Sequence, residues 1–179
     1  MIKKRKCKYC RQPFEPIAFL QKNCFDPGCV TEWIQETKQK EWIKKKAKLK
    51  ADLMTLSDYT KILQQLVNKY VRMRDIGKPC ISCEKRITGK TDAGHLFSVG
   101  NYPSVRFDLR NLAAQCITCN QFNGGNIHEY RKNLINKIGI TEFEDLERKA
   151  HETRKFSIPE LKEMIQEYKQ KIKKHGNEL

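Results

Sequence analysis

The stretch CISCEKRITGKTDAGHLFSVGNYPSVRFDLRNLAAQCITCN, from Cys80 to Asn120, decides the fold of this chain. It begins and ends with two cysteines separated by two residues, Cys80/Cys83 and Cys116/Cys119. Such a pair sits on a tight turn that aims two thiolates at one metal ion, and four thiolates satisfy tetrahedral Zn²⁺. Because a four-thiolate site has no open coordination position, we expect this zinc to hold shape and to take no part in chemistry.

The other four cysteines repeat the pattern near the N-terminus, as Cys7/Cys10 and Cys24/Cys29. A module of residues 1–30 is too small to fold without its metal. Disulfides are the alternative, but close pairs in a reducing compartment favour two structural zinc sites. Basic residues surround the first pair, which suits phosphate contact, although a purely structural or protein-binding finger would carry the same charges.

The charge balance points to a polyanionic partner. The 179 residues include 36 Lys and Arg against 21 Asp and Glu, a formal net charge of +15. Nucleic acid fits this excess best, since each phosphate contact releases counterions. An anionic membrane surface is the rival, but no apolar run approaches the length of a membrane span and no secretory segment follows the first methionine. We therefore expect a cytoplasmic protein that does not associate with membranes.

The sequence predicts a mostly helical α+β fold in four segments. These are a four-cysteine zinc module at 1–30, a basic helical connector at 31–55, a metal-pinned core with its preceding helix at 56–139, and C-terminal helices at 140–179. Between Lys38 and Lys50 seven lysines accompany the single acid Glu41. This helix is either a solvated connector or lies along a duplex backbone, and the second reading assigns DNA contacts to Lys44, Lys45 and Lys46.

Local signals predict where elements begin. The first helix is expected from about Thr31, and Ser57 is expected to cap the amphipathic helix that leads into the core. Within the core, Lys90 to Val99 is expected to form a hairpin-like pair of strands. Two capping-box patterns predict later helix starts, Thr141-x-x-Glu144 and Ser157-x-x-Glu160.

The order of motifs resembles a known superfamily. Between the cysteine pairs stand D-x-x-H, with Asp92 and His95, and N-L, with Asn111, while Asn120 follows the last cysteine directly. This arrangement is similar to the HNH, or ββα-metal, endonucleases, whose core is a treble-clef-like zinc scaffold. Over nearly the full length the layout, with PCISC, DAGH, RF-x-x-RN and QC-x-x-CN, resembles the bacteriophage NinG (Rap) recombination proteins.

The resemblance implies roles for individual residues. His95 would be the general base that takes a proton from the attacking water. Asp92 and Asn120 would hold one Mg²⁺ or Mn²⁺, because these hard ions prefer oxygen ligands, and Asn111 would orient the His95 ring. Many family members place the acidic ligand directly before the histidine, where this chain has Gly94, so Asp92 either reaches the metal or only caps the turn. Two arginines would clamp phosphate, Arg106 and Arg110.

The implied function is metal-dependent cleavage of branched DNA, such as Holliday junctions or D-loops, in phage recombination. A homodimer would suit this function, because resolving a symmetric junction takes two incisions. Two alternatives stay open at this point: a zinc protein that binds nucleic acid without cutting it, and an HNH nuclease that cuts a specific duplex sequence. Branch preference follows from the resemblance alone, because no residue pattern distinguishes a junction from a duplex.

Overall fold

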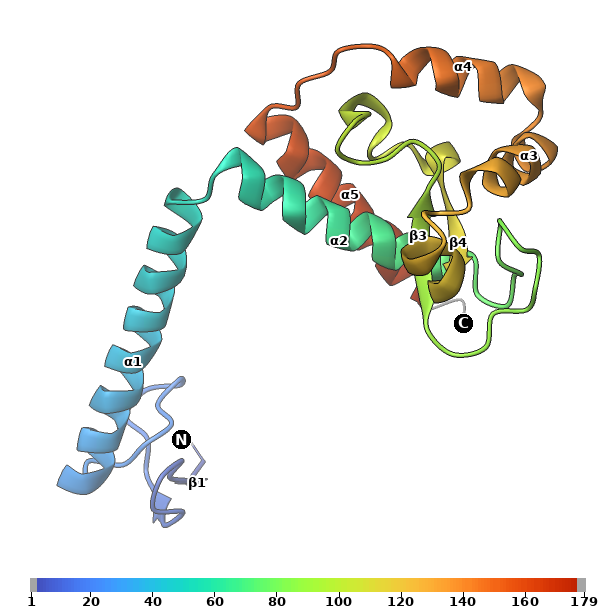
Figure 1. Ribbon diagram of the computed structural model, residues 1–179. Helices are drawn as coiled ribbons and strands as arrows, with labels where there is room; N and C mark the ends of the chain where they lie inside the picture. Colours follow the sequence, from blue (N-terminus) through green and yellow to red (C-terminus); the bar gives the residue numbers. More distant parts are fainter. Residues whose placement is uncertain (1–2, 177–179) are drawn as a thin grey trace. The chain divides into compact units, whose positions relative to one another are not determined.

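The structure, a computed structural model, describes residues 3–176, so the outermost residues of the expected first and last segments lie outside it. It confirms a mostly helical α+β fold with small sheets (Figure 1). Three single helical turns also occur, η1 (Pro103–Val105), η2 (Leu109–Asn111) and η3 (Thr118–Phe122). The longer elements are β1 (Arg5–Lys6), β2 (Pro13–Phe14), α1 (Pro27–Asp52), α2 (Leu56–Arg74), β3 (Thr91–His95), β4 (Leu112–Cys116), α3 (Ile127–Ile138), α4 (Ile140–Ala150) and α5 (Ile158–Gly176).

The chain divides into two compact units, one ending at Met54 and the other beginning at Thr55. In the first unit β1 and β2 pair antiparallel and α1 follows. Helix α1 begins at Pro27, four residues before the expected Thr31. The Asp26 carboxylate caps it by accepting hydrogen bonds from the two backbone N–H groups after Pro27, and a proline suits the first helical turn.

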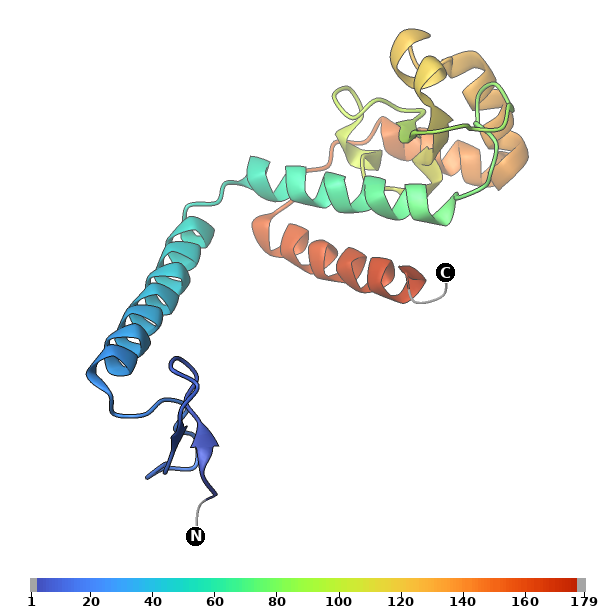
Figure 2. The same cartoon turned by 90° about the horizontal axis from the view of Figure 1, so that it is seen from below.

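In the second unit, helices α2 and α5 lie side by side and run in the same direction, as Figures 1 and 2 both show. Helix α2 does not begin at the expected Ser57. Its N-cap is Thr55, whose hydroxyl accepts from the Asp58 N–H while the Asp58 carboxylate accepts from the Thr55 N–H. This reciprocal pair satisfies two N-terminal donors, which Ser57 would not do from inside the first turn.

Strand β3 pairs with β4 antiparallel, with Asp92 opposite Gln115 and His95 opposite Leu112. The expected hairpin within 90–99 is therefore wrong. After His95 the chain leaves the sheet, passes through η1 and η2 in a sixteen-residue loop, and returns as β4. The two arms of the hairpin are thus joined by a long loop that a local pattern search does not find.

The small sheet separates two apolar cores. On one face Leu112 joins residues of α2 and α5, including Leu63 and Leu161. On the other face Ala113 joins residues of α3 and α4, including Tyr130. Alternation along β4 sends successive side chains into opposite cores, so the sheet is fixed from both sides.

The two capping-box predictions have different outcomes. Helix α4 starts directly after Gly139, and no side chain caps it, so the Thr141 box is wrong. Helix α5 does begin with the predicted box, in which the Glu160 N–H donates to the Ser157 hydroxyl and the Ser157 N–H to the Glu160 carboxylate. Within residues 3–176, the helices are all too short or too polar to traverse a lipid bilayer.

Candidate metal centres and active site

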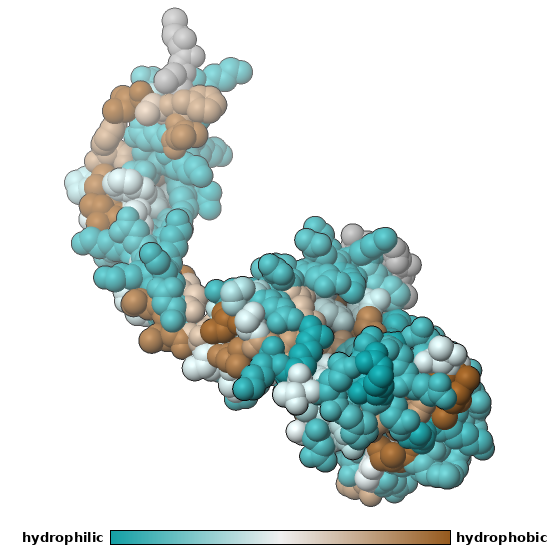
Figure 3. Space-filling model, turned by 90° about the horizontal axis from the view of Figure 1, so that it is seen from above, coloured by the Kyte–Doolittle hydropathy of each residue, from teal (hydrophilic) through white to brown (hydrophobic). Residues whose placement is uncertain are grey.

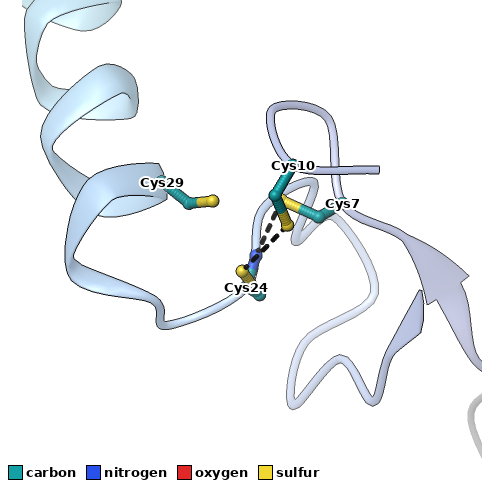
Figure 4. A group of neighbouring side chains, drawn as sticks. All are labelled: Cys7, Cys10, Cys24 and Cys29. Atoms are coloured by element: carbon teal, nitrogen blue, oxygen red, sulfur yellow. Dashed lines mark hydrogen bonds between the residues drawn. The ribbon is translucent and has the colours of Figure 1, made fainter. Parts of the chain in front are cut away.

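Eight free cysteines form two clusters, and in each the four sulfur atoms lie within 4.8 Å of one another. Figure 4 shows the first cluster, in which one thiol comes from the start of α1 and three from the preceding loops. The sulfur–sulfur distances across the clusters, 3.8 Å and 3.9 Å, are far from the roughly 2 Å of a disulfide. The clusters are Cys7, Cys10, Cys24 and Cys29, and Cys80, Cys83, Cys116 and Cys119.

These distances fit a tetrahedral metal site. Four thiolates each about 2.3 Å from one ion lie about 3.8 Å apart at the corners of a tetrahedron. Both clusters can therefore bind a metal ion such as Zn²⁺ with four sulfur ligands. With all four positions taken by protein, such an ion would stabilise the fold and leave no place for substrate.

The first cysteine pair of each cluster stands on the same kind of turn. The residue after the pair, Arg11 or Glu84, has a left-handed backbone with φ of 62° or 56°. Its N–H donates back to the carbonyl of Cys7 (3.1 Å) or Cys80 (2.9 Å). Non-glycine residues adopt this conformation only where the surroundings demand it, and here the turn aims two sulfurs at one point.

The structure brings Asp92 and Asn120 together. The Asn120 side-chain amide donates to Asp92 Oδ2 at 2.9 Å, and the neighbouring Gln121 donates to the same oxygen at 2.7 Å. Asn120 lies in η3, a single π-helical turn that starts between the last two cysteines of the second cluster. The amide oxygen of Asn120 and the second oxygen of Asp92 remain as donors of the type that Mg²⁺ and Mn²⁺ prefer.

His95 ends strand β3 and is half-buried against α2. Its Nε2 lies 3.4 Å from the Gln64 side-chain amide, and Gln64 Oε1 accepts a 2.8 Å hydrogen bond from Arg106 Nε. Burial lowers the pKa of His95 to about 4, and the positive charge of Arg106 acts in the same direction. The imidazole is therefore neutral at pH 7, the form that a general base requires.

Strand alternation places Asp92 and His95 on opposite faces of the sheet. Ala93 shares the His95 face and packs in the core with α2, whereas Asp92 is paired with Gln115 on the other face. A two-stranded sheet is narrow, so a phosphate at its end can be reached from both faces. In the protein alone, however, Asp92 and His95 do not form one contiguous cluster.

Asn111 is completely buried and fastens the loop that follows His95. Its Oδ1 accepts from the Phe97 N–H at 2.9 Å, and its Nδ2 donates to the carbonyls of Phe97 (3.0 Å) and Val105 (3.1 Å). It holds the backbone on the far side of His95 and has no hydrogen bond to the imidazole. Asn111 is thus a positioning residue, and its influence on His95 passes through the main chain.

The two candidate phosphate-binding arginines differ. Arg110 is tied to three carboxylates, Asp108 at 2.6 Å, Glu142 at 2.7 Å and Asp145 at 2.9 Å, because η2 turns its side chain toward α4. A phosphate would have to compete with these ion pairs, and the expected clamp stays a prediction. Arg106 donates from its Nε to Gln64 Oε1, and its expected contact with phosphate stays a prediction.

The α1 lysines expected to contact DNA, Lys44, Lys45 and Lys46, are all exposed. Lys46 lies over the ring of Trp42 at 4.8 Å from its centroid. Within residues 3–176 none of the three forms an ion pair, so no acidic side chain there offsets their charges. The expected role in DNA contact stays a prediction.

Gly94 stands directly before His95 on β3, and the space beside it is already occupied. A Cβ added at Gly94 would lie 2.1 Å from Oε1 of Gln115, which is fully buried on β4. The Gln115 amide donates to the Ser82 hydroxyl (2.7 Å) and the Gly125 carbonyl (2.5 Å), joining the first cysteine turn of the second cluster and the segment before α3 to the sheet. Gly94 is therefore required for packing, which leaves Asp92 as the carboxylate available on this strand.

Three glutamines at the site were not foreseen from the sequence: Gln64, Gln115 and Gln121. Gln64 lies on a helix whose pattern shows only packing, and it meets His95 across 31 positions of sequence. Gln115 and Gln121 flank the last cysteine pair, and this proximity was the one available signal. Glutamine carries no charge and recurs in no metal-ligand spacing, so a motif search passes over it.

Comparisons with known proteins give one consistent family. Residues 1–178 match the family model described as "NinG: Bacteriophage Lambda NinG protein". The chain is 36% identical to the protein ninG of Salmonella phage P22 over 190 residues, covering 95% of this chain and 93% of that one. It is also 36% identical to that of Escherichia phage lambda (95% and 92%) and 34% identical to that of Escherichia phage 933W (95% and 92%). No solved structure matches.

Proposed function

Because the chain belongs to the NinG family of bacteriophage proteins, we propose that it is a metal-dependent DNA endonuclease of the HNH type that acts on branched DNA during phage recombination. The observation that carries this proposal is the Asp92–Asn120 contact on a strand that ends in a neutral histidine. Sequence order alone suggested these residues, and the fold brings two of them within hydrogen-bonding distance from positions 28 residues apart.

Each residue has a defined task in the proposed reaction. Neutral His95 accepts the proton of the water that attacks phosphorus, and Gln64 holds the ring edge. Arg106 binds a non-bridging phosphate oxygen. A nearby phosphate raises the pKa of His95 from about 4 toward the working pH, because negative charge favours the imidazolium.

The oxygens of Asp92 and Asn120 suit one Mg²⁺ or Mn²⁺ ion. When bound, such an ion supplies positive charge that offsets the charge developing on the phosphate and the leaving 3′ oxygen. An ion held by the remaining oxygens of Asp92 and Asn120 would lie beside the hydrogen bonds that join Asp92 to Asn120 and Gln121, so its binding would be coupled to the position of η3.

Replacing His95 tests the proposal directly. With Mg²⁺ or Mn²⁺ we expect His95→Ala to abolish cleavage of a four-way junction while zinc content and DNA affinity stay at wild-type levels. His128→Ala is the matched control, because His128 is an exposed histidine in the first turn of α3. Full activity in His95→Ala would overturn the mechanism.

Branch preference needs its own measurement. We expect a four-way junction to be cut faster than a linear duplex of the same length and composition. Equal rates on both would remove the branched substrate from the proposal, and a single preferred sequence on the linear DNA would favour a sequence-specific nuclease.

A second candidate is a zinc-dependent nucleic-acid-binding protein without catalysis. The placement of Asp92 and His95 on opposite sheet faces favours it, because the histidine then has a structural partner in Gln64. Its signature is tight, salt-sensitive binding with no cleavage in either divalent ion.

A further inference from the structure

A groove of about 550 Å³ lies in the N-terminal unit, between the segment that precedes α1 and the first turns of α1. Its apolar lining is unusually exposed, with Ile17 at 77%, Leu20 at 77%, Phe25 at 65% and Trp33 at 48% of their full surface. In Figure 3, brown apolar patches interrupt the hydrophilic surface of this unit at the upper left. Clustered apolar side chains left in water mark a binding surface. We infer that this groove binds unpaired nucleobases of single-stranded DNA.

The charge around the groove selects an anionic ligand. Lys8, Lys22 and Lys40 line it together with one acid, Glu36. Glu36 already pairs with Lys8 and Lys40 and accepts a hydrogen bond from Tyr9, so its charge is offset from within the protein. The surrounding residues 1–54 carry 14 Lys and Arg against six Asp and Glu, an excess of eight. An apolar ligand with negative charge beside it suits this lining.

Nucleotides combine these two properties. Each has a flat base with an apolar face and a phosphate next to it. The groove offers aromatic faces from Tyr9, Phe25 and Trp33, and bases of every sequence stack on such faces. Its volume falls within the range of sites that enclose small organic groups. Binding by stacking also requires the base to be unpaired and exposed, which excludes the interior of a duplex.

The biological meaning of this site rests on the proposed function. Branched intermediates expose unpaired or unstacked bases where strands diverge, whereas continuous duplex does not. Under the proposed function, the residues around His95 contact only phosphate and water, so they cannot distinguish branched DNA from continuous duplex. The groove would supply branch selectivity from a separate unit of the protein.

The two tryptophans of the chain allow a matched fluorescence test. Trp42 is on the same helix and similarly exposed at 55%, but it lies outside the groove, nine residues or about half a turn around from Trp33. In divalent-ion-free buffer, the Trp42→Phe variant retains only Trp33, and we expect a 20-nucleotide oligothymidylate to quench it while blunt duplex does not. The Trp33→Phe variant, which retains only Trp42, should respond little to either.

Affinity measurements complete the test. Trp33→Leu keeps an apolar side chain but loses the aromatic face, and we expect it to weaken oligothymidylate binding about 5- to 100-fold. Trp33→Phe should restore most of the affinity, and Trp42→Leu should stay within about twofold of wild type. Zinc content and circular dichroism confirm that each variant is folded.

Wild-type affinity in folded Trp33→Leu, or equal quenching of Trp33 by duplex, overturns the inference. The inference is also overturned if the Trp33 fluorescence changes with protein concentration and not with DNA concentration, because a second copy of the protein would then cover the groove. The binding assay contains no divalent ion, so it does not depend on cleavage. Full activity of His95→Ala would overturn the nuclease mechanism without affecting this inference, and wild-type DNA affinity of Trp33→Leu would overturn this inference without affecting the nuclease mechanism.

Discussion

Gly94→Ala would test how the sheet is joined to the second cysteine cluster. The new methyl group would lie 2.1 Å from Gln115 Oε1, 3.0 Å from its Cδ and 3.1 Å from its Cβ. Gln115 must therefore move, although it is fully buried and its amide holds Ser82 and Gly125. Overpacking of this kind costs about 1–3 kcal/mol, and each buried partner left unsatisfied adds about 1–3 kcal/mol. We expect a loss of about 2–4 kcal/mol.

The measurement is urea unfolding of the zinc-loaded protein, followed by circular dichroism. Gly100→Ala is the matched control, because a Cβ there meets nothing within 4 Å. Shortening Gln115 to Ala in the Gly94→Ala background should remove the clash, so the two changes should be coupled by about 1–3 kcal/mol. A Gly94→Ala protein as stable as Gly100→Ala, or strictly additive losses in the double variant, would show that the reasoning is wrong.

Four further outcomes are expected from single substitutions. Burial raises the pKa of Asp75, but hydrogen bonds from neighbouring basic side chains outweigh this effect and hold the pKa at about 2. Asp75→Asn should therefore lower the free energy of unfolding by about 2 kcal/mol at pH 7. In an acid titration the difference in stability between the two proteins should vanish as the pH falls from about 4 to about 2. The pKa of His95 is lowered to about 4, so as the pH falls the unfolded chain binds a proton at this residue before the folded protein does. The free energy of unfolding, measured by denaturant titration and compared with that of His95→Asn, should therefore fall by about 2 kcal/mol between pH 7 and pH 5. Arg110→Gln should lower the thermal midpoint and leave DNA affinity, measured by fluorescence anisotropy, unchanged. Arg106→Gln should leave the thermal midpoint unchanged and lower DNA affinity. Cys10→Ser should reduce bound zinc, measured by mass spectrometry, from two ions per chain to about one.

The sequence predicted the features that depend on local spacing. The two four-cysteine clusters form as expected because a pair two residues apart determines its own turn. The amphipathic helices and the Ser157 cap are likewise present, since periodicity and capping act within a few residues. The family follows from motif order along the whole chain.

Long-range contacts were not predictable in the same way. The partner strand of β3 comes from beyond a sixteen-residue loop, and its register is set by two cores on opposite faces. From the sequence, Arg110 is expected to clamp phosphate because it flanks the candidate site residues. Its partners Glu142 and Asp145 belong to α4, and only the folded chain brings them within reach.

Metal binding at the two cysteine clusters also changes the net charge of the protein. Four thiolates with one Zn²⁺ carry a charge of −2, so filling both clusters takes the formal net charge from +15 to +11. Two local centres of negative potential then lie inside a basic protein, one in each unit. Phosphates should be repelled from the thiolates themselves and attracted to the lysines around them. Under the proposed function, the zinc ions would therefore influence where on its surface the protein accepts a DNA strand.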